Sequence, residues 1–168
     1  VRNQSHELYN VGQMYEAAVV HYNATAKTSF LNVAIKNADL IVSVYGPEKR
    51  HDAPGHQEIE IGLAKLYRTT GEQKYLDLAK KKLDEQGKSD IRNYDSEDFW
   101  KNRTYWQDHK PVVEQDEAVG HALRAVYMYS GMADVSALTE NQKYTDAIST
   151  IWENVAGKKL YIPGGIQG

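Results

Sequence analysis

The chain has 168 residues, with 20 basic and 23 acidic side chains and a net charge of −3, and no Lys/Arg-rich face follows any segment, which argues against a nucleic-acid-binding protein. It contains no cysteine, so disulfides, thiolate metal ligands and thiol nucleophiles are excluded within these residues. No apolar run approaches the roughly 20 residues that a membrane-spanning helix requires, and the length suits one domain over residues 1–168.

Apolar residues recur at helical spacing through the first half of the chain and predict four helices. Ser5 is the expected N-cap of the first, Asp52 or Pro54 opens the third, and Gly71 and Gly87 end the third and fourth in the left-handed conformation that glycine adopts at little cost. The expected ranges are 5–24, 29–44, 52–70 and 73–85.

The second half of the chain begins with residues 88–112, which lack a clear period and are interpreted as a long loop that is anchored by aromatic side chains. Long ordered loops in compact domains often carry function. A fifth helix is predicted over residues 114–132, and a short linker holding Thr139 leads to a sixth helix over residues 142–155. Turn residues dominate the tail that follows.

A helical segment occurs twice in the chain, 45 residues apart. YNATAKTSFLNVAIKNADL starts at Tyr22 and YRTTGEQKYLDLAKKKLDE starts at Tyr67, and a weaker third copy, NQKYTDAISTIWENV, starts at Asn141. Repeats of this length are typical of stacked helical hairpins that share one core. The sequence therefore predicts an all-α fold built from three helical hairpins.

Three histidines lie near the predicted starts of the odd-numbered helices: His6, His56 and His121. If the odd helices form an inner ring, the three imidazoles converge near one mouth of that ring, although His121 is placed a turn or two inside its predicted helix. Converging imidazoles can exchange hydrogen bonds with sugar hydroxyls or bind a metal ion. Two alternatives stay open: three unrelated surface or core histidines, and a zinc site made of histidines alone.

The motif that starts at His6, HELYN, does not fit a metalloprotease, because Asn10 stands where the HExxH pattern needs its second histidine. Carboxylates next to the other two histidines are candidates for acid–base chemistry, or are residues that the dipole at a helix N-terminus favours. Aromatic residues of the long loop could stack on a sugar or pin the loop to the body. These candidates are Glu58, Glu60, Asp116 and Glu117 among the acids, and Trp100, Tyr105 and Trp106 among the aromatics.

Four blocks of the sequence resemble glycoside hydrolase family 127, the β-L-arabinofuranosidases. They are SHELYNVGQMYEAAVVHY, KRHDAPGHQEIEIGLAKLYRTTGEQKYLDLAK, QDHKPVVEQDEAVGHALRAVYMYSGMADV and KKLYIPGGIQG, and they cover nearly the whole chain in order. The resemblance implies an (α/α)6 barrel and retaining cleavage of β-linked L-arabinofuranose. It also implies that His6, His56 and His121 hold the sugar. Many relatives have histidine at Gln13, so no role is carried over to that residue.

The resemblance further implies a cysteine nucleophile held at zinc by further cysteines and a glutamate, and a separate glutamate as acid/base. Without cysteine, this chain cannot build that site, so we expect no catalytic residue and no metal ligand in it. We also expect the zinc to belong to a longer parent enzyme. Six helices are half of the twelve that the barrel needs. The chain is therefore interpreted as the N-terminal half of a barrel, inactive by itself.

Two hypotheses for function follow. In the first, the chain belongs to a bacterial glycosidase of the periplasm or cytoplasm that acts on a glycan containing L-arabinofuranosides. In the second, it is a non-catalytic helical-repeat module that binds sugar or serves as a scaffold. In either case a half-barrel leaves apolar faces exposed, so we expect it to pair with the rest of the barrel or with a copy of itself.

Overall fold

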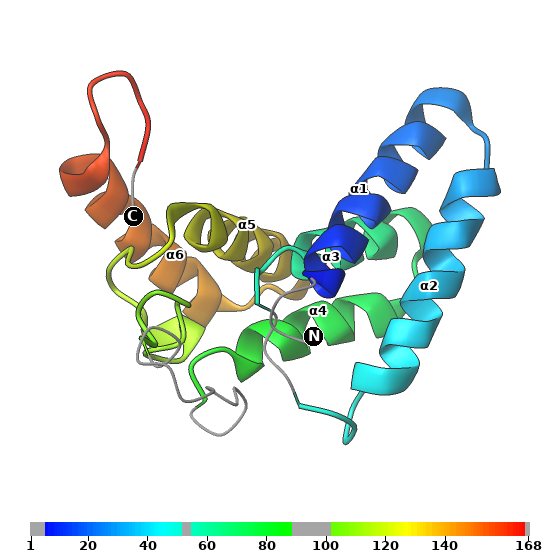
Figure 1. The fold of residues 1–168 in the computed structure, drawn as a ribbon, viewed down its shortest axis with the longest axis horizontal. Coiled ribbons are helices and arrows are strands. Elements are labelled where there is room, and N and C mark those ends of the chain that lie inside the picture. The colour runs from blue at the N-terminus through cyan, green and yellow to red at the C-terminus, as the bar shows by residue number, and fades with distance from the viewer. Residues whose placement is uncertain (1–5, 52–54, 89–101, 167–168) are drawn as a thin grey trace.

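The computed structural model describes residues 6–51, 55–88 and 102–166, and within these ranges the fold is all-α, with no strands. Six α-helices form three successive hairpins (Figure 1), with the hairpin of α3 and α4 between the other two. The helices are α1 (Glu7–Thr25), α2 (Ser29–Tyr45), α3 (Ile59–Thr70), α4 (Gln73–Glu85), α5 (Ala122–Thr139) and α6 (Gln142–Asn154); a 3₁₀ turn, η1 (Val112–Glu114), precedes α5, and a π-helical turn, η2 (Val155–Lys159), follows α6.

The odd-numbered helices form a row in which α3 packs between α1 and α5, and α4 packs on the other side of α3 against α2 and α5. This order agrees with the predicted inner and outer positions of the odd and even helices. The predicted all-α hairpin fold is confirmed, and it comprises half of the twelve helices that the family resemblance implies.

The helices α1 and α3 cross at close range, and two glycines meet at the crossing. A Cβ atom on Gly62 would lie 2.7 Å from the carbonyl oxygen of Gly12, and a Cβ on Gly12 would lie 2.9 Å from the backbone of Glu58. Only residues without a side chain permit this distance between the two backbones. The crossing brings the N-terminal ends of the two helices together, where two of the candidate histidines lie.

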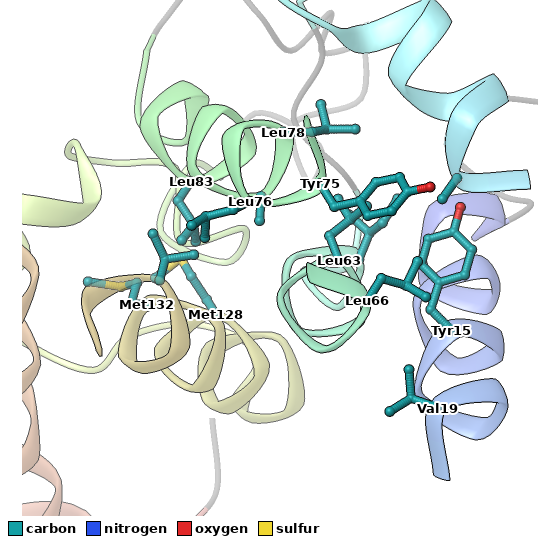
Figure 2. Packing of buried hydrophobic residues seen from close by; sticks show 14 of the residues in the cluster. Tyr15, Val19, Leu63, Leu66, Tyr75, Leu76, Leu78, Leu83, Met128 and Met132 are labelled. Carbon is teal, nitrogen blue, oxygen red and sulfur yellow. The ribbon is translucent and has the colours of Figure 1, made fainter. Parts of the chain in front are cut away.

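A single hydrophobic core runs through all three hairpins (Figure 2), with Leu76 and Leu83 of α4 packed beside Met128 and Met132 of α5. Burial of such side chains is the main favourable contribution to folding, at about 25 cal/mol per Å² of apolar surface removed from water. The largest members with little or no exposure are Tyr15, Ile59, Leu63, Leu66, Tyr75, Leu83, Met128, Met132 and Tyr144.

The repeat detected in the sequence is visible at the turns inside the hairpins. Ala26, Gly71 and Glu140 each follow the first helix of a hairpin and each adopt a left-handed conformation, with φ of 56°, 74° and 52°. The N–H groups of Ala26 and Gly71 donate to the carbonyls of Tyr22 and Tyr67, both at 2.8 Å. The predicted C-cap at Gly71 is thereby confirmed.

Several predicted helix boundaries are wrong. The third helix begins at Ile59 rather than at Asp52 or Pro54, because Glu58 has φ −162° and ψ −36°, which is not helical. The fifth begins at Ala122 rather than at Glu114, because Gly120 has φ 72°, a left-handed conformation that a right-handed helix cannot contain. Thr139 ends α5 instead of lying in a linker. Ser5 and residues 52–54 lie outside the described residues.

The loop that precedes α5 is held to the body through its backbone. The carbonyl of Trp106 accepts hydrogen bonds from the side-chain amides of Gln57 at 3.0 Å and Gln86 at 2.7 Å. The N–H of His121 donates to the carbonyl of Tyr105 at 3.3 Å. These bonds, buried or partly buried, fix residues 105–106 against the start of α5.

None of the helices in the described ranges is long and apolar enough to cross a bilayer.

Candidate functional site

Each of the three predicted histidines stands directly at, or shortly before, the start of an odd-numbered helix. His6 is the residue before α1, His121 is the residue before α5, and His56 lies three residues ahead of α3. His121 therefore fits the pattern better than the sequence suggested, because α5 starts later than expected. Since α1, α3 and α5 pack side by side, their N-terminal ends bring the imidazoles to one place.

The three imidazoles form a contiguous cluster centred on His56. The ring centroids of His6 and His56 are 4.4 Å apart, and those of His56 and His121 are 5.9 Å apart, both in edge-to-face geometry. The predicted convergence of the three side chains is confirmed by these distances. Whether they hold a sugar stays a prediction.

Three tyrosines extend the cluster, two on one side and one on the other. Tyr9 of α1 contacts His56 edge-on at 5.5 Å, and its ring lies 5.9 Å from that of Tyr127 on α5. The hydroxyl of Tyr127 accepts a hydrogen bond of 3.3 Å from the amide of Gln13. On the other side, Tyr105 contacts His121 at 5.6 Å. Imidazole nitrogens and phenol hydroxyls thus come together from α1, α5 and two loops.

A buried cation lies directly behind the cluster. Arg124, one helical turn after His121, holds its guanidinium carbon 4.0 Å from the ring centroid of Trp106 and 4.8 Å from that of Tyr105. The residue is almost completely buried. Stacking on two aromatic faces keeps a planar guanidinium in a fixed position, so its positive charge is a permanent part of the site.

Burial and this charge keep His56 and His121 in the neutral form. Desolvation, followed by the positive charge of Arg124 and the neighbouring His6 and His121, lowers the pKa of His56 to about 4. Desolvation and Arg124 also lower the pKa of His121 below its usual value. A neutral imidazole has one nitrogen that donates and one that accepts a hydrogen bond, which is the combination that a sugar hydroxyl can use.

The cluster opens on one side into a hollow of about 570 Å³. His121 and Tyr105 belong both to its lining and to the cluster. Its polar wall includes Asn102 and Thr104, and the rest is made by Gly120, Ala122 and Ile166. Sugar-sized ligands bind in concave sites with few polar groups, and a ligand in this hollow would meet the cluster at His121 and Tyr105.

The candidate carboxylates do not reach the hollow. Glu58 and Glu60 are both completely or almost completely buried, and within the described residues their carboxyl oxygens have no hydrogen-bond partner. Burial raises the pKa of each to about 7, and for Glu58 the charge of Glu60 adds to the effect. The prediction of an acidic residue in the first turn is confirmed for Glu60, whereas Glu58 precedes the helix. Desolvation opposes the stabilisation that the helix dipole gives a carboxylate in that turn. Asp116 and Glu117 instead form ion pairs with Lys110 and Lys159, at 2.7 and 2.9 Å.

The two aromatic residues of the loop that can be placed have different positions. Trp106 is buried beneath Arg124 and pins the loop, whereas Tyr105 is half-buried and lines the hollow. Trp100 lies outside the described residues. Sequence reasoning missed Tyr9, Tyr127 and Arg124. Helical spacing from His6 and His121 could have found them, because each lies three or six residues after one of these histidines.

The residues present do not fit the zinc site that the family resemblance implies. That site needs several cysteine thiolates, and the chain has no cysteine. Among the described residues, no three His, Asp or Glu side chains are arranged to hold a metal ion, including the histidine cluster. The alternative of a zinc site made of histidines alone therefore has no support in this geometry.

Comparison with known proteins gives a consistent result over the whole chain. The sequence matches the family model described as "Beta-L-arabinofuranosidase, GH127 catalytic domain" over residues 1–168. It is 36% identical to a non-reducing end β-L-arabinofuranosidase of Bifidobacterium longum, over 97% of this chain and 27% of that protein.

Two solved structures are also similar. One is a GH127 β-arabinofuranosidase with 54% identity and a TM-score of 0.87, matched over 99% of this chain and 25% of the other. The second is a GH127 β-L-arabinofuranosidase from Geobacillus stearothermophilus T6, with 38% identity and a TM-score of 0.90, matched over 98% and 28%. The chain thus spans about a quarter of the length of these relatives.

Proposed function

The chain belongs to the family of GH127 β-L-arabinofuranosidase catalytic domains, and we propose that the protein containing it releases β-linked L-arabinofuranose from a glycan, with His6, His56 and His121 binding the sugar. The observation that carries the proposal is the meeting of three imidazoles at the N-terminal ends of α1, α3 and α5, where His121 also lines a hollow. Relatives named as β-L-arabinofuranosidases match nearly the full length of the chain.

The chemistry of the cluster suits an uncharged, hydroxyl-rich ligand. Because His56 titrates near pH 4 and the pKa of His121 is lowered, both are neutral at physiological pH. The Nδ1 atom of each ring is buried, so Nε2 is the nitrogen that can donate to or accept from a hydroxyl, and the two rings together can orient a furanose. Orienting the sugar contributes to catalysis by positioning, because the entropy cost of aligning the reacting carbon is met when the sugar binds and not in the chemical step.

In this proposal the groups that break the glycosidic bond are supplied by residues other than these 168. Neither buried glutamate can reach a ligand in the hollow, and the chain offers no thiol. The zinc ion that the resemblance implies would likewise be held elsewhere in the protein. The chain by itself is therefore expected to bind sugar weakly and to hydrolyse nothing.

The test compares histidine variants in the complete gene product. Release of arabinose from a synthetic aryl β-L-arabinofuranoside is measured for the unchanged protein, for His56→Gln and for His51→Gln. We expect His56→Gln to lose one hydrogen bond to the sugar, worth on the order of 1.5 kcal/mol. Its binding of the arabinofuranoside should therefore be roughly tenfold weaker than that of the unchanged protein. His51→Gln is the matched control, because His51 pairs with Glu85 outside the cluster.

A complete gene product that binds L-arabinose without cleaving any arabinofuranoside would favour the alternative of a sugar-binding module. Equal effects of His56→Gln and His51→Gln would contradict the proposed role of the histidines. Turnover by the 168-residue chain alone would contradict the proposal that the bond-breaking groups lie elsewhere.

A further inference from the structure

A buried glutamine joins the loop before α5 to the segment that carries His121. Gln107 is 0% exposed and does not itself line the hollow. Its side-chain amide donates hydrogen bonds to the carbonyl of Val119 at 2.8 Å and to that of His121 at 3.3 Å. A third hydrogen bond, of 3.2 Å, runs to the carbonyl of Tyr105. One side chain thus holds both of the chain segments that meet at the hollow.

Only a hydrogen-bond donor suits the position of this amide. Three carbonyl oxygens converge on one nitrogen atom, Nε2 of Gln107, and an oxygen in its place would repel them. An amide that is removed from water must regain its hydrogen bonds inside the protein, because its burial is otherwise unfavourable. The amide of a glutamine has two N–H groups, so the donors of Gln107 are fully used on these three carbonyls.

The backbone of the His121 segment fits closely around the amide. A Cβ atom on Gly120 would lie 2.8 Å from Nε2 of Gln107. The N–H of His121 donates to the carbonyl of Tyr105 at 3.3 Å, and the same carbonyl accepts from Gln107. A shift of the amide is therefore passed directly to the backbone that carries the imidazole.

The backbone of Gln107 adopts a left-handed conformation, with φ 54°, which is unfavourable for a residue with a side chain. At Ala26 and Glu140 the same conformation ends a helix, where it is common. Gln107 instead lies in a series of turns over residues 103–107. Its own amide and that of Gln115, which donates to the carbonyl of Gln107 at 2.9 Å, hold this conformation in place. Strained residues that are held by the surrounding structure are concentrated at functional sites.

We propose that Gln107 is a positioning residue that holds the backbone of His121, and with it the imidazole, in place at the hollow. The inference rests on the proposed binding of sugar by His121. Gln107 does not touch the ligand in this arrangement, and it acts through His121 and through the loop carbonyl of Tyr105. Its contribution is preorganisation of a binding group, which reduces the entropy cost of ordering the site when the sugar binds.

A double-mutant cycle in the complete gene product tests whether Gln107 acts through His121. KM for an aryl β-L-arabinofuranoside is measured for the unchanged protein, for Gln107→Met, for His121→Ala and for the double variant. We expect KM to rise roughly tenfold in each single variant, which corresponds to the loss of one hydrogen bond to the sugar. The double variant should have the KM of His121→Ala alone, because no imidazole is left to position. Effects that multiply would show that Gln107 acts independently of His121, and would overturn the proposal.

Gln115→Met is the matched control for a general loss of stability. Gln115 is also buried, and its amide donates to two backbone carbonyls, those of Gln107 and Lys110, neither of which belongs to the His121 segment. Both glutamine variants are expected to lower the melting temperature, and only Gln107→Met is expected to raise KM. An equal rise of KM in both would indicate a loosened loop and no positioning role. If Gln107→Met does not fold, Gln107→Glu takes its place in the cycle, because it keeps the shape of the side chain and, when protonated, one donor.

The result for His121→Ala separates this proposal from the proposed function. An unchanged KM in His121→Ala would contradict sugar binding by His121, and with it the positioning role of Gln107. A raised KM in His121→Ala together with an unchanged KM in Gln107→Met would leave sugar binding intact and overturn the positioning role alone.

Discussion

Replacing Glu60 by glutamine should change the stability of the protein in a way that depends on pH. Glu60 lies in the first turn of α3, is 1% exposed and packs against Gly131 of α5. Burial raises its pKa to about 7 from the usual 4.5, although nearby backbone N–H groups and the charge of Lys82 favour the ionised form. Glutamine has nearly the same shape as the protonated carboxyl but cannot ionise.

The sign and size of the effect follow from the two pKa values. Between pH 4.5 and 7 the unfolded chain loses the proton of Glu60 while the folded protein keeps it, so the folded state binds more protons and stability falls as pH rises through this window. A difference of 2.5 between the two pKa values corresponds to about 3.5 kcal/mol at 1.4 kcal/mol per unit, and most of it falls between pH 4 and pH 8. Relative to the unchanged protein, Glu60→Gln should therefore gain about 3 kcal/mol on going from pH 4 to pH 8.

Urea unfolding at these two pH values, followed by far-UV circular dichroism, measures the effect. The difference between variant and unchanged protein is the quantity to compare, because His56 acts in the opposite direction. Its folded pKa of about 4 lies below the usual 6.5, so its contribution to stability grows as pH rises through that interval and cancels in the difference. A free-energy difference that is the same at pH 4 and pH 8 would refute the reasoning that Glu60 is buried and protonated.

Two further predictions concern the helix crossing and the charge behind the histidines. Gly62→Ala should cost about 1–3 kcal/mol of unfolding free energy, because its Cβ would meet the carbonyl of Gly12 at 2.7 Å and force α1 and α3 apart. Gly157→Ala, whose Cβ meets no atom within 4 Å, is the control. Equal melting temperatures of the two variants would argue against the close crossing. Arg124→Met should raise the pKa of His121 because it removes a nearby positive charge, and an NMR titration of the imidazole resonances would detect the change. Arg124→Lys keeps the charge and should change the pKa less. The same titration midpoint in the unchanged protein and in both variants would contradict the electrostatic argument.

The hairpins were predictable from the sequence because each signal involves neighbours along the chain. α2 and α4 were expected within one residue of their observed bounds, since capping and turn residues act locally. The start of α5 was not, because residues 114–119, EQDEAV, contain no glycine or proline and carry the acidic residues that are common in the first turn of a helix. What keeps them out of the helix is the left-handed Gly120, at which a Cβ would lie 2.2 Å from the carbonyl of Thr104. That approach is a long-range contact, which no local pattern contains.

The histidine cluster was predictable for the same reason that the hairpins were. In a repeat protein each unit packs on the next in the same way, so corresponding residues of successive units lie close together. Three histidines near the starts of three inner helices therefore meet once those helices pack side by side. Arg124, which helps to set the protonation state of the histidines, was harder to predict from the sequence. Arg124 faces the cluster because its guanidinium stacks on Trp106 and Tyr105 of the preceding loop, and the sequence gives no indication of how that loop folds back.

The two buried glutamates show a local preference of helix ends that tertiary packing opposes. An acidic residue in the first turn of a helix is ordinarily stabilised as a carboxylate by up to about 1 kcal/mol, because the peptide dipoles present their positive end there. At Glu58 and Glu60 the same turn is covered by α1 and α5, as the contacts of these residues with Gly12 and Gly131 indicate. Removing a carboxylate from water costs several times more than the dipole returns, so both groups hold their protons to about pH 7. Tertiary packing of two neighbouring helices, and not helix position, therefore decides the charge of this turn, and the packing is permitted by two glycines on those helices.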